Sequence, residues 1–170
     1  MRSSLFLLLG LFTLPASLPA TVPAPHLAAT SFNQLAQPLP LPYDGQADAI
    51  ARVAAAKARA RAAHKLLMID LGGNWCLDCR ILAGTMELPD LVPWLRRHYE
   101  VVTVDIGRFD KNLAVPAHYG ITDRLKGVPS LLIVDPRTDR LLNTGATAAL
   151  ADARSMTPQG LADYLARWAR

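Results

Sequence analysis

Cysteine is scarce in this sequence. Among 170 residues there are only two, Cys76 and Cys79, and they lie three positions apart. A small secreted domain that relies on disulfides needs distant cysteines that close large loops, whereas a bond between such near neighbours constrains the unfolded chain very little. The sequence therefore excludes a disulfide-stapled scaffold, and it indicates that the pair has a chemical role.

Aromatic residues are also few, at 6% of the sequence, although the formal net charge is +4. A basic chain suggests nucleic-acid binding, but base stacking needs aromatic side chains among the cations. Many of the cations gather instead on one alanine-rich stretch without aromatics: Arg52, Lys57, Arg59, Arg61 and Lys65. This pattern favours a solvated helix face, and no nucleic-acid partner is expected.

The apolar run at residues 5–14 is too short to span a membrane comfortably, because a spanning helix needs about 20 apolar residues. It follows one positive charge and precedes small residues and prolines at 15–20. This order is typical of a secretory signal peptide, with a membrane anchor as the alternative. We expect residues 1–20 to be removed, with cleavage after Ala20 or Ala24, and the protein to be exported to the bacterial periplasm.

Proline separates the next segment from the rest of the chain. Five prolines and little charge at 21–42 predict a mobile linker or an extended arm, and we place this linker at residues 21–45. The chain is long enough for one domain with one core, which we expect over residues 46–170.

Helical and strand-like segments alternate in the remainder of the chain. An alanine-rich helix is expected at 47–64, and the continuous apolar run at 66–71 suits a strand that is covered on both faces. The other expected elements are strands at 99–106 and 130–134, a hairpin partner at 141–143, and helices at 76–86, 91–95, 113–119 and 158–168. This order predicts an α/β sandwich around a mixed sheet.

The cysteine pair lies where a buried strand gives way to a helix. Residues three apart on a helix face the same way, so the sulfurs of Cys76 and Cys79 can form one disulfide. Cys76 would lie at the helix start, where free N–H groups and the helix dipole favour an anion and lower a thiol pKa. The pattern predicts that Cys76 is the nucleophile and that Cys79 resolves the mixed disulfide.

A cysteine pair of this spacing can also bind zinc. A structural zinc site needs four ligands, and without a third cysteine His98 and His118 would have to complete the set. Isolated histidines in such segments are mostly surface or core residues, so no metal site is expected.

The residues around the pair resemble the thioredoxin family. Trp75 directly precedes the first cysteine, Asp70 lies six residues before it on the expected strand, and the segment 127–130, Gly-Val-Pro-Ser, is similar to the family's cis-proline loop. The resemblance covers residues 65–134 well, the C-terminal helix loosely and the first 45 residues not at all. It implies a thioredoxin-like three-layer sandwich, with a central mixed β-sheet and helices on both faces.

The resemblance also implies a thiol–disulfide oxidoreductase that acts on cysteine-containing proteins and needs no dissociable cofactor. Val128, next to a cis Pro129, would pair with a substrate strand through its backbone, and Trp75 would give an apolar contact. Asp70 would take the proton of Cys79, because burial raises the pKa of a carboxyl group. A strand-end aspartate turned to solvent is the alternative.

Several features depart from the family's pattern. Asp78 lies between the cysteines, where its carboxylate should disfavour the Cys76 thiolate, so we expect the protein to act as a reductase rather than as an oxidant. A membrane protein would then supply the electrons that reduce the cysteine pair. Val101 stands where family members often carry a lysine near the buried acid.

The stretches 122–126 and 146–156 look longer than usual, and we interpret them as neutral surface loops rather than partner surfaces.

Two other classes of function stay open. One is a metal-handling module that binds copper or zinc through the two thiolates. The other is a redox-inert interaction domain on the same fold, against which the presence of both cysteines argues. We expect a monomer in each case.

Overall fold

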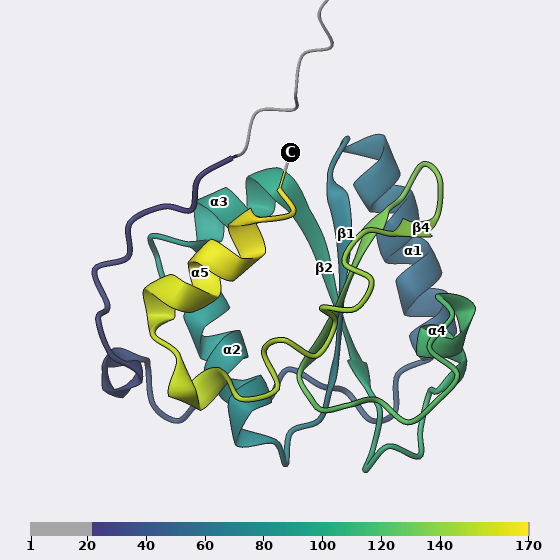
Figure 1. The fold of residues 1–170 in the computed structure, drawn as a ribbon, viewed down its shortest axis with the longest axis horizontal. Coiled ribbons are helices and arrows are strands. Elements are labelled where there is room, and N and C mark those ends of the chain that lie inside the picture. Colours follow the sequence, from purple (N-terminus) through teal and green to yellow (C-terminus); the bar gives the residue numbers. More distant parts are fainter. Residues whose placement is uncertain (1–21, 170) are drawn as a thin grey trace, which may run out of the picture.

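The computed structural model describes residues 22–169, so the expected signal peptide lies outside the described residues. A four-stranded mixed sheet in the order β2-β1-β3-β4 forms the centre of the molecule (Figure 1). β1 (Leu66–Gly72) pairs in parallel with β2 (Tyr99–Asp105) and antiparallel with β3 (Ser130–Asp135), which pairs with the short β4 (Arg140–Leu141). All residues of β1 are buried, as a strand covered on both faces requires.

Helices cover both faces of this sheet (Figure 1). One face carries α2 (Leu77–Met86), α3 (Val92–His98) and α5 (Pro158–Ala166), and the other carries α1 (Ala49–Ala62) and α4 (Ala114–His118). Alternate residues of β1 point to opposite faces of the sheet, so Met68 packs in the core with the first group of helices and Ile69 in the core with the second. The predicted three-layer sandwich is confirmed. Within residues 22–169, none of the helices combines the length and apolar character that crossing a bilayer requires.

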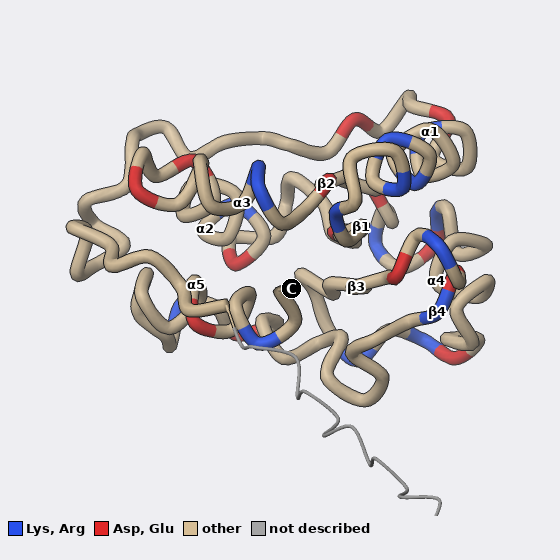
Figure 2. The backbone as a smooth tube through the Cα atoms, turned by 90° about the horizontal axis from the view of Figure 1, so that it is seen from above, with Lys and Arg blue, Asp and Glu red and all other residues tan. Residues whose placement is uncertain are grey.

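Several Lys and Arg residues lie along α1 (Figure 2). Arg52, Arg59 and Arg61 are exposed, whereas Val53 and Ala56 are buried against the sheet. Buried residues recur every three or four positions, which is the spacing of one helix face. The basic character of this stretch therefore belongs to an ordinary amphipathic helix.

Residues 22–45 form an arm that packs along the domain, and this corrects the interpretation of the segment as a mobile linker. The arm, purple to blue in Figure 1, passes α3, α5 and α2 before it reaches α1 and contains one 3-10 turn, η1 (Phe32–Gln34). Leu27 and Leu35 belong to the core beside α2 and α5, with 2% and 3% exposure. Proline content indicated an extended backbone but not the burial of the leucines between the prolines.

Hydrogen bonds fix the arm at several points. Trp94 Nε1 donates to the Pro23 carbonyl at 2.9 Å, and the Leu27 N–H donates to Gln159 Oε1 at 2.9 Å. The Arg80 guanidinium donates to the Leu39 carbonyl at 2.9 Å. These bonds tie the arm to α3, α5 and α2 in turn.

A pair of leucine variants tests whether the arm belongs to the folded domain. Replacing Leu27 with alanine is expected to lower the free energy of unfolding by about 2–5 kcal/mol, because a cavity opens in the core. The matched Leu41→Ala change, at a position of the same arm that is 64% exposed, should leave stability within about 0.5 kcal/mol. Urea denaturation followed by circular dichroism measures both, and equal midpoints would contradict the packing of the arm.

Residues 146–156 are not the neutral surface loop that the sequence suggested. Leu150 and Ala153 are buried in the core beside α5, and the Leu131 N–H of β3 donates to the Thr147 carbonyl at 2.8 Å. The segment ends in a 3-10 turn, η2 (Ala153–Ser155), which lies against α2. It thereby brings residues from near the C-terminus to the helix that carries the cysteines.

Candidate active site

The two cysteines lie at the start of α2, one turn after the end of β1. Cys76 is the N-cap residue of this helix, and its Sγ accepts a hydrogen bond from the Cys79 backbone N–H at 3.2 Å. Cys76 is 6% exposed and Cys79 is fully buried, and both are free thiols. The structure therefore brings the two sulfurs together at the helix start, where the sequence placed them.

The surroundings of Cys76 favour its thiolate. A hydrogen bond with the Cys79 side chain lowers the pKa of Cys76, burial opposes this, and the Cys79 backbone N–H lowers the pKa further, to about 7. The pKa of Cys79 is raised instead, by its hydrogen bond with Cys76 and by burial. Cys76 is thus the more acidic thiol of the pair, and Cys79 needs a base before it can attack.

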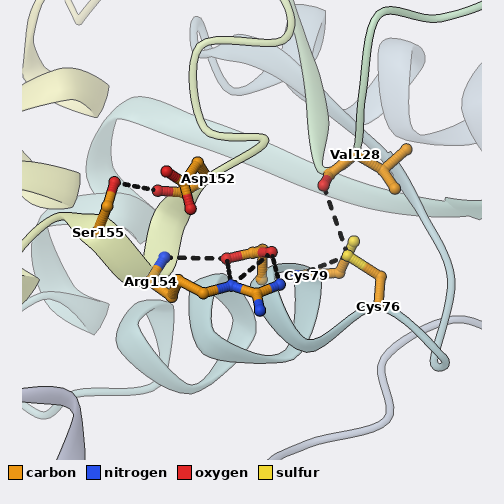
Figure 3. Close-up of polar contacts among 7 residues, drawn as sticks. Cys76, Cys79, Val128, Asp152, Arg154 and Ser155 are labelled. Carbon is orange, nitrogen blue, oxygen red and sulfur yellow. Dashed lines mark hydrogen bonds and ion pairs between the residues drawn. The ribbon is translucent and has the colours of Figure 1, made fainter.

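The loop before β3 closes one side of the cysteine pair. The Val128–Pro129 peptide bond is cis, and the Val128 carbonyl accepts a hydrogen bond from the Cys76 thiol at 3.5 Å (Figure 3). Trp75 is 44% exposed, and its Nε1 donates to the Gly107 carbonyl at 2.8 Å. The residues expected to bind substrate therefore lie next to the nucleophile, Val128 through this hydrogen bond and Trp75 as its neighbour in the chain.

Asp70 lies on β1 with its side chain fully buried, so the alternative of an aspartate turned to solvent does not hold. Burial raises the pKa of Asp70, a hydrogen bond from Tyr43 lowers it and the Cys76 charge raises it, to about 7 in all. Oδ2 has no hydrogen-bond partner within the described residues. A carboxyl group with this pKa exchanges its proton readily near neutral pH.

Tyr43 of the arm is a site residue that sequence reasoning missed. The Tyr43 hydroxyl donates a hydrogen bond to Asp70 Oδ1 at 2.9 Å, and Tyr43 itself is buried, with 4% exposure. A Cβ on Gly72 would lie 2.5 Å from this hydroxyl and 2.8 Å from Cys79 Sγ, so Gly72 leaves the space in which the phenol and the thiol meet. Burial and the Asp70 charge raise the pKa of Tyr43, which keeps the hydroxyl protonated as a donor.

The turn between β1 and α2 holds Tyr43 in place. Asn74 Oδ1 accepts a hydrogen bond from the Tyr43 N–H at 3.1 Å, and Asn74 Nδ2 donates to the Tyr43 carbonyl at 2.8 Å. Thr103 Oγ1 donates to the carbonyl of the preceding Pro42 at 2.9 Å. The buried acid therefore has a fixed neighbour from a segment that showed no resemblance to the family.

The Asp78 charge raises the pKa of Cys76, as the sequence predicted, but Asp78 also has a partner that the sequence did not reveal. Its side chain is buried, and it forms an ion pair with Arg154 of η2. Burial raises the pKa of Asp78, but hydrogen bonds from the Arg154 side chain and backbone outweigh burial and lower it. Arg154 was missed because its partner lies 76 positions away in the sequence.

The two histidines that could have completed a zinc site lie apart from the cysteines. His98 ends α3 and stacks on Trp94, whereas His118 ends α4 on the other face of the sheet and pairs with Asp139 at 2.9 Å. Across residues 22–169, no group of three or more His, Cys, Asp or Glu side chains is arranged to hold a metal ion.

The chain is similar to a known family and to solved structures. A family model described as thioredoxin-like matches residues 48–136. A disulphide isomerase from Xylella fastidiosa Temecula1 is 36% identical, with a TM-score of 0.69 over 75% of this chain and 96% of its own. A Pseudomonas aeruginosa protein of unknown function is 18% identical, with a TM-score of 0.39 over 72% of this chain and 84% of its own.

A search of curated proteins found no match to the chain. The family model nevertheless covers the segment from α1 to the end of β3, which holds both cysteines, the buried acid and the cis-proline loop. The Xylella structure shares the fold over nearly its entire length. The chain therefore belongs to the thioredoxin-like family.

Proposed function

We propose that this chain is a protein-disulfide oxidoreductase whose Cys76 and Cys79 cycle between dithiol and disulfide. The observation that carries the proposal is the position of Cys76 Sγ, at a helix start between the Cys79 N–H and the Val128 carbonyl. The thioredoxin-like family and the similar disulphide isomerase support thiol–disulfide exchange as the general chemistry.

In the first step, the Cys76 thiolate attacks a disulfide of the substrate. A bond forms between Cys76 Sγ and one substrate sulfur, the substrate disulfide breaks, and the other sulfur leaves as a thiolate. The Val128 backbone pairs with the substrate strand independently of its sequence, and exposed Trp75 provides an apolar contact.

In the second step, Cys79 resolves the mixed disulfide. Cys79 gives its proton to the Asp70 carboxylate and attacks Cys76 Sγ, which releases the second substrate sulfur as a thiolate. The products are a reduced substrate and a Cys76–Cys79 disulfide, so two electrons have passed from the pair to the substrate. No dissociable cofactor takes part in this exchange.

The pair in this proposal attacks existing disulfides, as a reductase or isomerase does. An attacking thiol is most effective when its pKa is close to the ambient pH, and the pKa of Cys76 is about 7. The reason that the sequence gave for a reductive lean was the Asp78 charge, and the ion pair with Arg154 weakens this reason. We further propose export to the periplasm, where a membrane electron donor would reduce the pair again.

Equilibration with a thiol–disulfide buffer, read by trapping free thiols, measures the reduction potential of the pair. We expect roughly −180 mV or lower, the range from isomerases to thioredoxin, whereas roughly −150 mV or higher indicates an oxidant. The Cys76→Ser variant, which cannot form the bond, is the control. A wild-type pair that does not titrate would contradict the enzymatic proposal and make metal content the next measurement.

A further inference from the structure

The Asp78 carboxylate is buried beside the nucleophile, which is unusual for an ionised group. Only 6% of its side chain is exposed, and a buried carboxylate is costly unless charged and hydrogen-bonding partners satisfy it. Arg154 supplies these partners, because its backbone N–H donates to Oδ1 at 2.9 Å and its Nε donates to Oδ1 at 3.0 Å and Oδ2 at 3.1 Å. Arg154 Nη2 donates to Oδ2 as well.

The backbone on each side of Arg154 is anchored, so the arginine is held against α2. Ala153 is fully buried in the core, and Ser155 Oγ donates to the Asp152 carbonyl at 2.8 Å, which closes the η2 turn. Figure 3 shows Arg154 beside the first turn of α2, on the side away from Val128. Arg154 therefore presents three donor groups from a fixed backbone to one carboxylate.

We propose that Arg154 is a positioning residue for the disulfide exchange: it holds the Asp78 carboxylate in an ion pair and so offsets much of the opposition of that charge to the Cys76 thiolate. This inference rests on the proposed function of the cysteine pair. It assigns a role to the segment 146–156, whose residues bring Arg154 to the site.

Several groups around Cys76 enter this balance. Its own helix contributes Cys79 and Asp78, β1 contributes Asp70, η2 contributes Arg154, and the loop before β3 contributes the uncharged Val128 carbonyl. Asp78 raises the pKa of Cys76 through its charge and lowers it through its backbone N–H.

Arg154 is attracted to both negative groups. Hydrogen bonds with Asp78 and the Asp78 charge raise its pKa most, and the Cys76 charge raises it further. Removal of the guanidinium therefore leaves the Asp78 charge uncompensated in a poorly solvated position near the thiolate. The Cys76 thiolate then becomes harder to form.

The test is the pH profile of Cys76 alkylation by iodoacetamide in the full reduced chain. The Arg154→Gln variant should move the midpoint upwards by about one pH unit, which corresponds to about fivefold slower alkylation at pH 7. The Asp78→Asn/Arg154→Gln double variant removes both charges and should return within about twofold of wild type. Arg167→Gln, which removes an arginine stacked over Tyr164 instead, should leave the midpoint unchanged.

Two outcomes overturn the inference: an unchanged midpoint in a folded Arg154→Gln variant, or a double variant that keeps the full shift of the single one. If Arg154→Gln does not fold, the comparison moves to the Asp78→Asn background. There, loss of Arg154 should change the alkylation rate by less than about twofold, and a larger change overturns the inference. Failure of the proposed function would give a different result, because the wild-type protein would then exchange no disulfides at any midpoint of Cys76 alkylation.

Discussion

Replacement of Cys79 with serine is expected to stop turnover and to leave the protein bound covalently to its substrates through Cys76. Cys79 is buried beside Cys76, and in the proposed mechanism it attacks within the same molecule. Well-oriented intramolecular groups reach effective molarities of about 10⁵ M or more, so millimolar external thiols are a poor substitute. We expect the rate of turnover to fall on the order of 10³-fold, while the first attack by Cys76 continues.

Non-reducing electrophoresis after incubation with a disulfide-containing protein detects the trapped adduct. The matched Cys76→Ser variant keeps the buried thiol and loses the acidic one, so it should give neither turnover nor adduct. If Cys76→Ser formed the adduct and Cys79→Ser did not, the assigned order of attack would be reversed. If neither variant formed it, the two-step exchange itself would be contradicted.

Replacement of Asp70 with asparagine is expected to slow the resolving step by about 100-fold. Removal of a positioned general base costs typically 10²–10⁴-fold, and Asp70 is the ionisable group on β1 that interacts with Cys79. Rapid-mixing measurement of mixed-disulfide decay, from pH 5 to 9, separates this step from the first attack. The wild-type rate should rise as pH passes through about 7, the pKa of Asp70, and this rise should be absent in the variant.

The matched Tyr43→Phe variant keeps the carboxyl group and removes only the hydroxyl. The hydrogen bond from Tyr43 lowers the pKa of Asp70, so its loss should move the rise in resolving rate to a pH above 7. The rate at high pH should remain close to that of wild type. If the Asp70→Asn variant resolves the mixed disulfide at the wild-type rate, Asp70 is not the base for Cys79. If the pH profile of Tyr43→Phe is the same as that of wild type, Tyr43 does not tune the pKa of Asp70.

The same carboxyl group makes a prediction about stability. The pKa of Asp70 is about 7 in the folded chain and 3.8 as its ordinary value, so between these values the folded state holds a proton that the unfolded state has lost. The free energy of unfolding should therefore fall as pH rises through this interval, by roughly 4 kcal/mol. Urea titrations from pH 4 to 8 should show this slope reduced in Asp70→Asn.

Local patterns were enough to predict the frame of the site. An unbroken apolar run gave β1, and the cysteine spacing at its end gave the first turn of α2. Asp70 could be predicted as a buried acid because its neighbours in the run are Ile69 and Leu71, in a strand expected to be covered on both faces, and the structure then excluded the solvent-facing alternative. In each case the signal lay within a few residues of the feature.

No nearby sequence pattern identified the residues that adjust the pKa values of the site. Tyr43 meets Asp70 across 27 positions, and Arg154 meets Asp78 across 76. One comes from a proline-rich segment and the other from a segment that looked like a loop insertion, and neither composition reveals which side chain is buried. The sign of the Asp78 charge effect on Cys76 was predicted correctly, but the ion pair that offsets this charge comes from a partner that only the fold supplies.

The arm also has a consequence for the order in which the chain can fold. Leu27 lies near the start of the described chain, but its N–H bonds to Gln159, 132 positions later. The core that buries Leu27 includes Leu161 and Leu165, so this leucine cannot reach its final surroundings until almost the whole chain is available to fold. Contacts of such long range slow folding, and the first described segment to be synthesised is among the last to dock.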